Sequence, residues 1–378
     1  MTRSITQRPR IGILFAQFAA YHVDRIEAAA RLLAGRAEVI AVEVAQASAT
    51  YAWSPSGEVR GAEKRTLFTG RPYEQIGHLQ RFRAAFKALR GCDTVFIGVG
   101  YNEPDTIALA LALRLVGRRV IMMGDSKFDD VPRALWREGF KALLLGVYSG
   151  ALVAGPRHVD YIRFLGFRTR PVQIGYDTVN LARVRAQAAE GGDTLSLPWT
   201  DRPFVFVGRF VAKKNIAFLL EAFADYRLRD GTRRLILVGG GELEDELAAK
   251  ITALELADAV EVTGFVDTME VSRRLSQGLA LLLPSTEEQW GLVVNEALAF
   301  GLPVVASEAV GSRYTLVHNL INGFVLATDA TDGWTAAMHA LDSDEAAWTK
   351  MVEASLALSP AADTTRFAEA IEALMGCG

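Results

Sequence analysis

The chain has 378 residues, 50% hydrophobic and 22% charged, which suits two globular domains and excludes an intrinsically disordered protein. No apolar run reaches the roughly 18–20 residues of a membrane span, and two lone cysteines, Cys92 and Cys377, give no disulfide or metal framework and favour a reducing, cytoplasmic compartment. Residues 1–178 carry a net charge of +9 (25 basic, 16 acidic) and the remainder −12 (16 basic, 28 acidic), which suggests an anionic partner for the first half, with undirected drift of surface charge as the alternative.

The first half alternates short β-branched apolar runs with patterns of helical period. Strands are predicted at residues 11–15, 38–44, 94–100, 119–124 and 151–155, and helices at residues 23–33, 104–116 and 156–165. Strands of this length that alternate with helices predict a parallel sheet covered on both faces.

After a polar, glycine-containing stretch at residues 181–201, the alternation starts again. Further strands are predicted at residues 204–208, 234–240, 260–264, 279–284 and 303–307. We therefore predict an α/β protein with two Rossmann-like, doubly wound parallel-sheet domains that face a cleft. The predicted domains are residues 1–178 and 179–358, and a final segment, residues 359–378, holds a helix that crosses back onto the first domain.

The stretch with the most chemical information is residues 281–307, in which a strand, a polar loop and a helix follow one another. The helix begins near Gly291, so its first backbone N–H groups are available to an anion such as a diphosphate. Glu288 lies on the loop and Glu296 inside the helix, so both carboxylates can face one cleft and accept hydrogen bonds from pairs of sugar hydroxyls.

Three further turns follow predicted strands of the same half. Gly208 allows a sharp turn, after which Arg209 and Lys214 are suited to phosphate oxygens, although solvated loop charges are the more common role of such residues. A glycine-rich turn (Gly239 to Gly241) and a turn with Gly264 and Phe265 are weak indications when taken alone.

Taken together, residues 204–326 resemble the donor-binding domain of family 4 retaining glycosyltransferases, which have the GT-B fold. The resemblance rests on the Glu-x7-Glu spacing of Glu288 and Glu296, the Gly208, Arg209 and Lys214 loop, the glycine-rich turn and the run from Trp290 to Ala297. Residues 174–180 resemble the segment that ends the family's first domain.

The resemblance implies roles for individual residues. Glu296 would bind the ribose hydroxyls, Glu288 the donor sugar, and Arg209 and Lys214 the diphosphate of a nucleotide sugar. The amides of Gly291 and Leu292 would complete the phosphate site, Asn295 would lie near the sugar or diphosphate, and Phe265 would border the base. The implied donor site also includes Gly208, Gly239, Gly241 and Trp290, and the implied catalytic set is Glu288, Arg209, Lys214 and His22.

The resemblance also implies retention of configuration, no cofactor and no metal. No Asp-x-Asp loop of the kind that metal-dependent sugar transferases use is recognised, and the adjacent Asp129 and Asp130 are expected to be ordinary loop acids. Three positions depart from the family pattern: Gln289 replaces a common glycine, Thr315 replaces a common glutamate, and the first loop (residues 16–24) lacks the usual glycines.

The first domain offers candidates for the acceptor side at the ends of its strands. They are Gln17, Tyr21, His22, Asp125 and Ser126. Basic residues on two predicted helices favour an anionic membrane surface or a lipid diphosphate, with a solvated helix face as the alternative. These basic residues are Arg81, Arg83, Lys87, Arg90, Arg133, Arg137 and Lys141.

The function expected from the resemblance is transfer of a hexose or hexosamine from a nucleotide sugar, with UDP favoured over GDP. The expected acceptor is a lipid-linked saccharide of the cell envelope or an exopolysaccharide, and the enzyme would be cytoplasmic and peripheral on the inner face of the membrane. A soluble small-molecule acceptor, a nucleotide-sugar epimerase, a polyglucan synthase or phosphorylase, and a non-catalytic binding subunit remain as alternatives. Nucleic acid is not expected as a partner, since no interleaving of basic and aromatic residues occurs.

Overall fold

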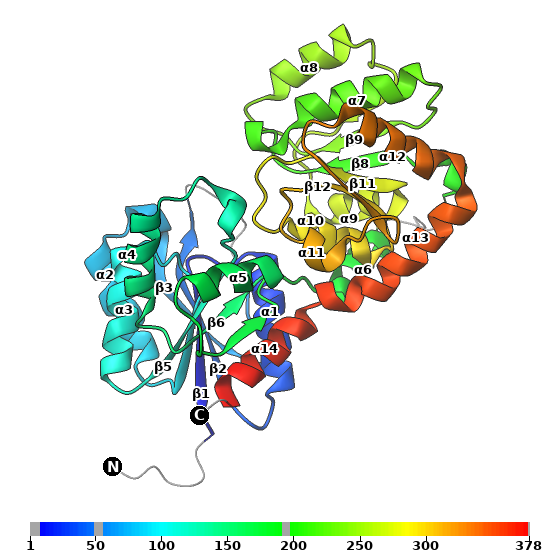
Figure 1. The fold of residues 1–378 in the computed structure, drawn as a ribbon. Coiled ribbons are helices and arrows are strands. Elements are labelled where there is room, and N and C mark those ends of the chain that lie inside the picture. Colours follow the sequence, from blue (N-terminus) through cyan, green and yellow to red (C-terminus); the bar gives the residue numbers. More distant parts are fainter. Residues whose placement is uncertain (1–7, 49–55, 191–196, 377–378) are drawn as a thin grey trace. The chain divides into compact units, whose positions relative to one another are not determined.

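The computed structural model describes residues 8–48, 56–190 and 197–376, and the chain divides into two compact units (Figure 1). The first unit consists of residues 1–180 and 364–378, and the second of residues 181–363. The sequence-based divisions after residues 178 and 358 lie near these limits. Cys377 and residues 191–196 of the polar stretch lie outside the described residues.

The first unit alternates strands and helices in the order expected of a doubly wound sheet. Its strands are β1 (Arg10–Phe15), β2 (Glu38–Ala47), β3 (Glu63–Pro72), β4 (Thr94–Ile97), β5 (Arg119–Gly124), β6 (Gly150–Val153) and β7 (Val172–Ile174). Its helices are α1 (Ala20–Leu32), α2 (His78–Leu89), α3 (Pro104–Leu115), α4 (Leu135–Leu145), α5 (Pro156–Phe164) and α14 (Thr364–Gly376), with short 3-10 turns η1 (Tyr73–Gln75) and η2 (Phe128–Asp130).

Within the described residues, the strands of this unit form one parallel sheet of seven strands in the order β3-β2-β1-β4-β5-β6-β7. Alternate residues of each strand enter two separate cores because successive side chains point to opposite faces. In β1, Leu14 joins the core beneath α2, α3 and α5, whereas Ile13 and Phe15 join the core beneath α1 and α14.

The helix α14, although last in the chain, belongs to this first unit. It packs beside α1, as Figure 1 shows, and contributes buried apolar side chains such as Phe367 and Ile371 to the core that contains Phe15. Gly175 approaches the backbone of Arg366 so closely that a Cβ there would lie 2.7 Å from the Arg366 carbonyl oxygen. The C-terminal segment is thus integral to the first sheet's covering layer.

The second unit repeats the alternation. Its strands are β8 (Phe204–Val207), β9 (Leu235–Val238), β10 (Val260–Val262), β11 (Ala280–Leu283), β12 (Val304–Ser307) and β13 (Gly323–Leu326). Its helices are α6 (Leu181–Glu190), α7 (Ile216–Leu228), α8 (Glu244–Ala253), α9 (Thr268–Gln277), α10 (Leu292–Ala299), α11 (Arg313–Leu316), α12 (Thr331–Ser343) and α13 (Glu345–Leu358), with turns η3 (Trp199–Asp201), η4 (Ala212–Lys214) and η5 (Ser359–Ala362).

In the described part of the second unit, six parallel strands follow the order β10-β9-β8-β11-β12-β13. The chain runs outward from β8 to β10 and then returns to the other side of β8 with β11. The carboxyl ends of β8 and β11 therefore flank the point where the order reverses, where open α/β sheets bind ligands. Helices α6, α9 and α10 pack together, and α7 packs with α8 and α12.

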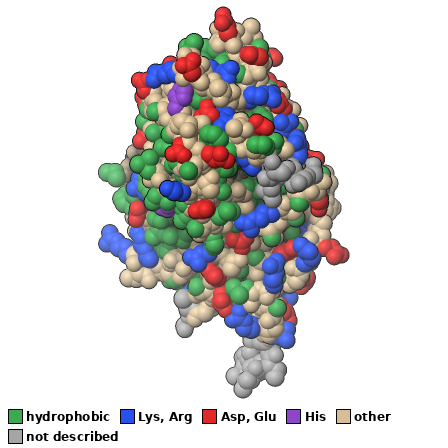
Figure 2. Space-filling view, turned by 90° about the vertical axis from the view of Figure 1, so that its right-hand side faces the viewer, with side chains coloured by type: hydrophobic (Ala, Val, Ile, Leu, Met, Phe, Trp, Pro, Cys, Tyr) green, Lys and Arg blue, Asp and Glu red, His purple; other side chains and the backbone are tan. Residues whose placement is uncertain are grey.

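The face drawn in Figure 2 mixes basic, acidic and hydrophobic side chains over short distances, so neither sign of charge dominates it. Among the described residues, no helix is both long enough and apolar enough to cross a membrane.

Candidate functional site

The loops after β8 and β11 are joined at the switch point of the second sheet. The backbone N–H of Thr286 donates to the carbonyl of Lys213 at 2.8 Å. The side-chain amide of Asn215 donates to the carbonyls of Pro284 (3.3 Å) and Thr328 (2.9 Å). Asn215 has a left-handed backbone with a φ of 57°, which Asn tolerates better than most residues, and it begins α7. The sequence indicates that a helix starts near Asn215, but not that this side chain joins the loops.

These bonds bring two of the predicted charged residues into contact. The ammonium of Lys214 forms an ion pair with Oε2 of Glu288, and both side chains are about 15% exposed. The hydroxyl of the fully buried Ser285 lies 3.3 Å from the same carboxylate oxygen. The structure thus pairs a cation and an anion whose spacing in the sequence is 74 residues. A phosphate could replace the carboxylate as the partner of Lys214 without leaving that ammonium unpaired.

The N-terminus of α10 lies directly after Glu288 in the same loop. Gly291 precedes the helix with a φ of 94°, a left-handed conformation that favours glycine. The first N–H groups of a helix, here those of Leu292 and its neighbours, have no partner within the helix and carry a partial positive charge. Arg209 is exposed on the neighbouring loop after β8. The Lys214 ammonium and a helix N-terminus therefore lie on joined loops at the switch point, with Arg209 on the same loop as Lys214, an arrangement suited to a diphosphate.

A third loop, after β12, supports the loop that carries Glu288. The N–H of Gly311 donates to the carbonyl of Glu288 at 3.1 Å, and the N–H of Ser312 donates to the carbonyl of Trp290 at 3.0 Å. A Cβ on Gly311 would lie 1.7 Å from the carbonyl oxygen of Gln289, so only glycine fits there. This support was not predicted, because nothing near Gly311 in the sequence indicates its partner.

Trp290 and Asn295 form a buried hydrogen-bond chain behind the start of α10. The indole N–H of Trp290 donates to Oδ1 of Asn295 at 2.9 Å, and Nδ2 of Asn295 donates to the carbonyl of Ala362 at 3.0 Å. Both side chains are buried, Asn295 completely. The enclosed amide of Asn295 ties the loop before α10 to η5, and its expected place near the sugar or diphosphate remains a prediction.

The glycine-rich turn after β9 lies against the turn after β8. Gly239 has a φ of 135°, and a Cβ there would lie 2.0 Å from the carbonyl oxygen of Gly208. A Cβ on Gly241 would lie 2.6 Å from the carbonyl oxygen of Phe210. These glycines allow the segments after β8 and β9 to run side by side beyond the ends of the strands. The hydrogen bond from the Phe210 N–H to the carbonyl of Gly240 joins the two segments.

Phe265 and Glu296 complete the set of donor-side predictions. The ring of Phe265 is 74% exposed and borders Gly240, so it presents an aromatic face at the carboxyl edge of the sheet. Glu296 is partly buried on α10. Neither position is tested by a bound ligand, and the contacts with a base and a ribose remain predictions.

The first unit contains a cavity of about 490 Å³ at the carboxyl ends of β1 and β4. Three acceptor-side candidates, Gln17, Tyr21 and His22, line it together with aromatic and acidic side chains. Asp125 and Ser126 do not line this cavity. The structure thus groups three of the five candidates and separates the other two from them.

His22 is buried and lies at the start of α1. Its Nδ1 accepts a hydrogen bond from the backbone N–H of Ala19 at 3.1 Å, and its ring stacks on Phe15 with the centroids 4.1 Å apart. Burial, and secondarily the charge of Arg25, hold the pKa of His22 well below its usual value. The imidazole is therefore neutral near pH 7 and caps a helix, which leaves its proposed catalytic role to be tested.

The first loop replaces the usual glycines with side chains that anchor it to β2. The buried carboxylate of Glu43 accepts a hydrogen bond from the backbone N–H of Phe18 at 3.1 Å. The amide of Gln17 donates to the carbonyl of Gln46 at 2.9 Å. Because Phe18 is fully buried, this loop is part of the core rather than an open phosphate-binding turn.

Asp125 belongs to a second charged group in the first unit. Burial, and then repulsion from the carboxylate of Asp177, raise the pKa of Asp125 to about 7. Asp177 itself is paired with the buried guanidinium of Arg25 at 3.1 Å. Asp130 adds to the rise in this pKa, and Arg25 opposes it.

We expect Asp125→Asn to stabilise the first unit more at about pH 8 than at about pH 5. An unfolded aspartate loses its proton near pH 4, whereas folded Asp125 keeps its proton to about pH 7. The folded state binds more protons in this window, so its stability falls as the pH rises through it. Melting temperatures across this range test the expectation, with the exposed Asp160→Asn as control. An equal effect of Asp125→Asn at both pH values would contradict it.

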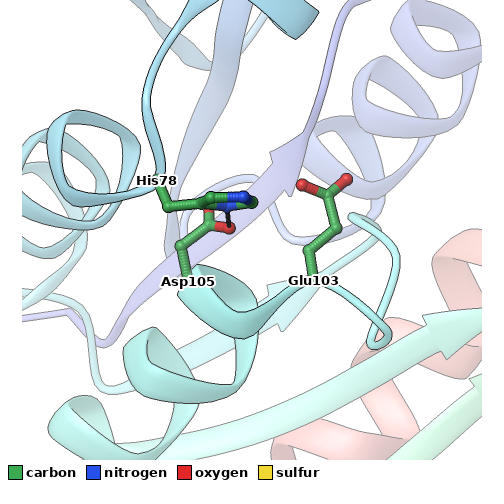
Figure 3. Close-up of side chains that lie close together, drawn as sticks. All are labelled: His78, Glu103 and Asp105. Carbon is green, nitrogen blue, oxygen red and sulfur yellow. Dashed lines mark hydrogen bonds and ion pairs between the residues drawn. The ribbon is translucent and has the colours of Figure 1, made fainter.

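A cluster of His78, Glu103 and Asp105 in the first unit has ligand atoms within 4.8 Å of one another (Figure 3). The guanidinium of Arg81 already contacts all three side chains of this cluster. Arg81 lies 2.6 Å from Glu103 Oε2, 3.1 Å from Asp105 Oδ2 and 2.6 Å from His78 Nδ1. The cluster therefore gives no support for a metal ion.

The same contacts correct one sequence prediction. Arg81 was expected on a basic face of α2 towards solvent or a membrane, but it is buried and paired. The other three basic residues of that group, Arg83, Lys87 and Arg90, are exposed.

Comparison with known proteins shows what this part of the chain is similar to. Residues 195–356 match the model of the glycosyl transferases group 1. The chain is 31% identical over 154 residues to an alpha-D-kanosaminyltransferase of Streptomyces kanamyceticus, a match that covers 40% of each chain. It is 30% identical over 146 residues to the amylovoran biosynthesis glycosyltransferase AmsK of Erwinia amylovora, with 37% of this chain and 36% of the relative covered. The chain thus matches about two fifths of the length of these relatives.

The fold comparison extends over almost the whole chain. HepE of Anabaena, solved in complex with UDP and glucose, superposes with a TM-score of 0.71 and 16% identity, covering 98% of this chain and 100% of that one. The two parallel sheets correspond to the fold of GT-B glycosyltransferases, as predicted. Residues 195–356 thus resemble group 1 of the glycosyl transferases, and the fold of the chain is that of GT-B proteins.

Proposed function

We propose that the chain transfers a sugar from a nucleoside diphosphate sugar to an acceptor hydroxyl, with retention of configuration and without a metal ion. The observation that carries this proposal is the contact of Lys214 with Glu288 beside the N-terminus of α10, at the switch point of the second sheet. Positive groups for a diphosphate and a carboxylate for sugar hydroxyls lie there within one set of joined loops.

In the proposed reaction, the acceptor oxygen forms a bond to the anomeric carbon while the bond from that carbon to the phosphate oxygen breaks. The diphosphate leaves with the electron pair, and the acceptor proton passes to the departing phosphate oxygen. Lys214, Arg209 and the first amides of α10 stabilise the negative charge that develops on the leaving group. Glu288 would then hold the sugar hydroxyls, Glu296 the ribose, and Phe265 the base.

UDP is the donor nucleotide that we favour, with GDP next. This choice is supported by the fold that the chain shares with HepE, which was solved with UDP and glucose. The transferred sugar would be a hexose or a hexosamine, since Glu288 supplies a carboxylate acceptor for adjacent hydroxyls.

For the acceptor, we propose a lipid-linked saccharide of cell-envelope or exopolysaccharide synthesis. The net charge of +9 on residues 1–178 suits an anionic acceptor, and one relative is named for the synthesis of amylovoran. A soluble small-molecule acceptor bound in the cavity around Tyr21 and His22 is the second candidate, because that cavity combines aromatic side chains with polar ones such as Gln17 and Glu103.

The test is a screen of the purified protein with UDP-, GDP-, ADP- and dTDP-sugars in the presence of EDTA. We expect one UDP-sugar to raise the melting temperature and to be hydrolysed slowly, because water can replace the acceptor. Release of free nucleoside diphosphate and the anomer of the transferred sugar identify the reaction. An absolute requirement for a divalent metal, or no response to any donor, would contradict the proposal, and release of an epimerised sugar would favour the epimerase.

A further inference from the structure

The helix α4 of the first unit has an apolar face that points away from the protein. Leu135 is 82% exposed, Trp136 72% and Leu143 74%, and Phe140 is also exposed. Trp136, Phe140 and Leu143 lie at i, i+4 and i+7, so they form a single stripe along the helix. Scattered exposed apolar residues are ordinary, but a stripe of three large side chains on one helix, with the exposed Leu135 beside it, marks an interaction surface.

The inward face of α4 is the more polar of the two. Glu138 is buried, and its carboxylate accepts hydrogen bonds from the Tyr161 hydroxyl at 2.5 Å and from Lys141 at 2.7 Å. Only Leu145 is a buried apolar residue of this helix. A helix on a globular protein normally turns its apolar side inward, so α4 has the reverse polarity. The exposed apolar side chains of α4 therefore favour a partner outside the first unit that is itself apolar.

The charges beside the stripe are positive. Arg137 is exposed and its guanidinium lies 5.2 Å from the ring centroid of Trp136. Arg133 and Lys141 lie on the flanks and interact with Glu138 behind the stripe. The only carboxylate within the helix is that buried Glu138, so the outer face carries apolar and cationic groups without an acidic one.

We propose that α4 is the membrane-docking element of the chain and lies in the interface of an anionic bilayer. Leu135, Leu143 and Phe140 would enter the acyl boundary. Trp136 would lie at the level of the headgroups, and Arg137 would reach the lipid phosphates. This proposal selects α4 from the basic helices considered above, since α2 has Arg81 buried in an internal network. It does not depend on the transfer chemistry, although it would bring the first unit to a lipid-linked acceptor.

A second copy of the chain fits this surface less well than a bilayer does. Two α4 stripes packed against each other would bring both copies of Arg137 together, with no carboxylate on either face to compensate them. Anionic lipid headgroups provide that compensation, at about 1 kcal/mol for each basic residue near the surface.

The experiment measures sedimentation of the full chain with vesicles of phosphatidylcholine alone or mixed with phosphatidylglycerol, without nucleotide. We expect binding to the mixed vesicles, a loss of about tenfold or more in Trp136→Ser/Phe140→Ser, and a weaker loss in Arg137→Glu that high salt reproduces for the unchanged protein. Leu228→Ser is the matched control, since Leu228 is 84% exposed on the second unit. Circular dichroism and melting temperature establish that each variant is folded.

Three outcomes would overturn the proposal. They are no binding of the unchanged protein to mixed vesicles, equal binding by the α4 double variant, and a concentration-dependent dimer that the α4 substitutions abolish in place of vesicle binding. Donor hydrolysis is measured separately without vesicles and should be unaffected by the α4 substitutions. If the unchanged protein binds the vesicles but hydrolyses no donor, that result would count against the proposed function alone.

Discussion

Lys214→Ala is expected to lower turnover by roughly 10²–10³-fold, because it removes a cation that stabilises the leaving diphosphate. In the structure, this ammonium is held opposite Glu288 at the switch point, with both side chains largely shielded from water. An ammonium in such a place stabilises developing charge more strongly than one in bulk solvent. Arg209→Ala should have an effect of the same order. The measurement is kcat for transfer or for slow hydrolysis of the donor, at saturating donor concentration.

Lys213→Ala is the matched control, since Lys213 is adjacent, exposed and contributes to the loop only through its backbone carbonyl. It should keep turnover within a few-fold of the unchanged protein. Glu288→Gln separates the roles of the ion pair, because it keeps the shape of the loop but removes the charge beside Lys214. Near-normal turnover in both Lys214→Ala and Arg209→Ala would sink the proposed mechanism, provided that their melting temperatures show folded proteins.

The central strands of both sheets were predictable because they are buried on both faces. β8, β9, β11 and β12 are short runs of Val, Leu, Ile, Phe and Ala between glycines, prolines and polar residues, a pattern that few other structures share. Since ligands of such sheets bind at the carboxyl ends of the strands, the residues that follow each run were candidates before the fold was known.

Three of the four edge strands among the described residues, β3, β7 and β13, were missed for the opposite reason, whereas the edge strand β10 was predicted. β3 lies at the edge of the first sheet, is only partly buried and contains Glu63, Lys64 and Arg65, so no apolar run distinguishes it. β7 and β13, at the far edges of the two sheets, have three and four residues. An edge strand is defined mainly by backbone pairing with its neighbour, which sequence patterns do not record.

The residues that hold the site in place depend on partners distant in the sequence. The contact of Lys214 with Glu288 could be expected, since both follow predicted strand ends of one domain. The bond that holds Asn295 could not be foreseen, because its partner is the backbone of Ala362. Asn215 acts through the carbonyls of Pro284 and Thr328, and main-chain carbonyls are invisible to motif reasoning. The motifs therefore indicate which loops carry the candidate residues. The structure shows which hydrogen bonds hold those loops in place.

Gly311→Ala is expected to lower the free energy of unfolding by about 3 kcal/mol or more and to abolish donor binding. The added Cβ would meet the backbone of Gln289, at 1.7 Å from its carbonyl oxygen, and backbone cannot move aside as a flexible side chain can. The loop that carries Glu288 would have to shift, and with it the start of α10. Urea titration and donor binding by calorimetry measure the two effects.

The control is Gly333→Ala, in α12. A Cβ at this position has its nearest contact at 3.5 Å, so the substitution should instead stabilise the chain by about 0.5–1 kcal/mol. An Ala at position 311 with unchanged stability and donor affinity would show that these two loops do not approach as described, and the support assigned to the Glu288 loop would fall with it.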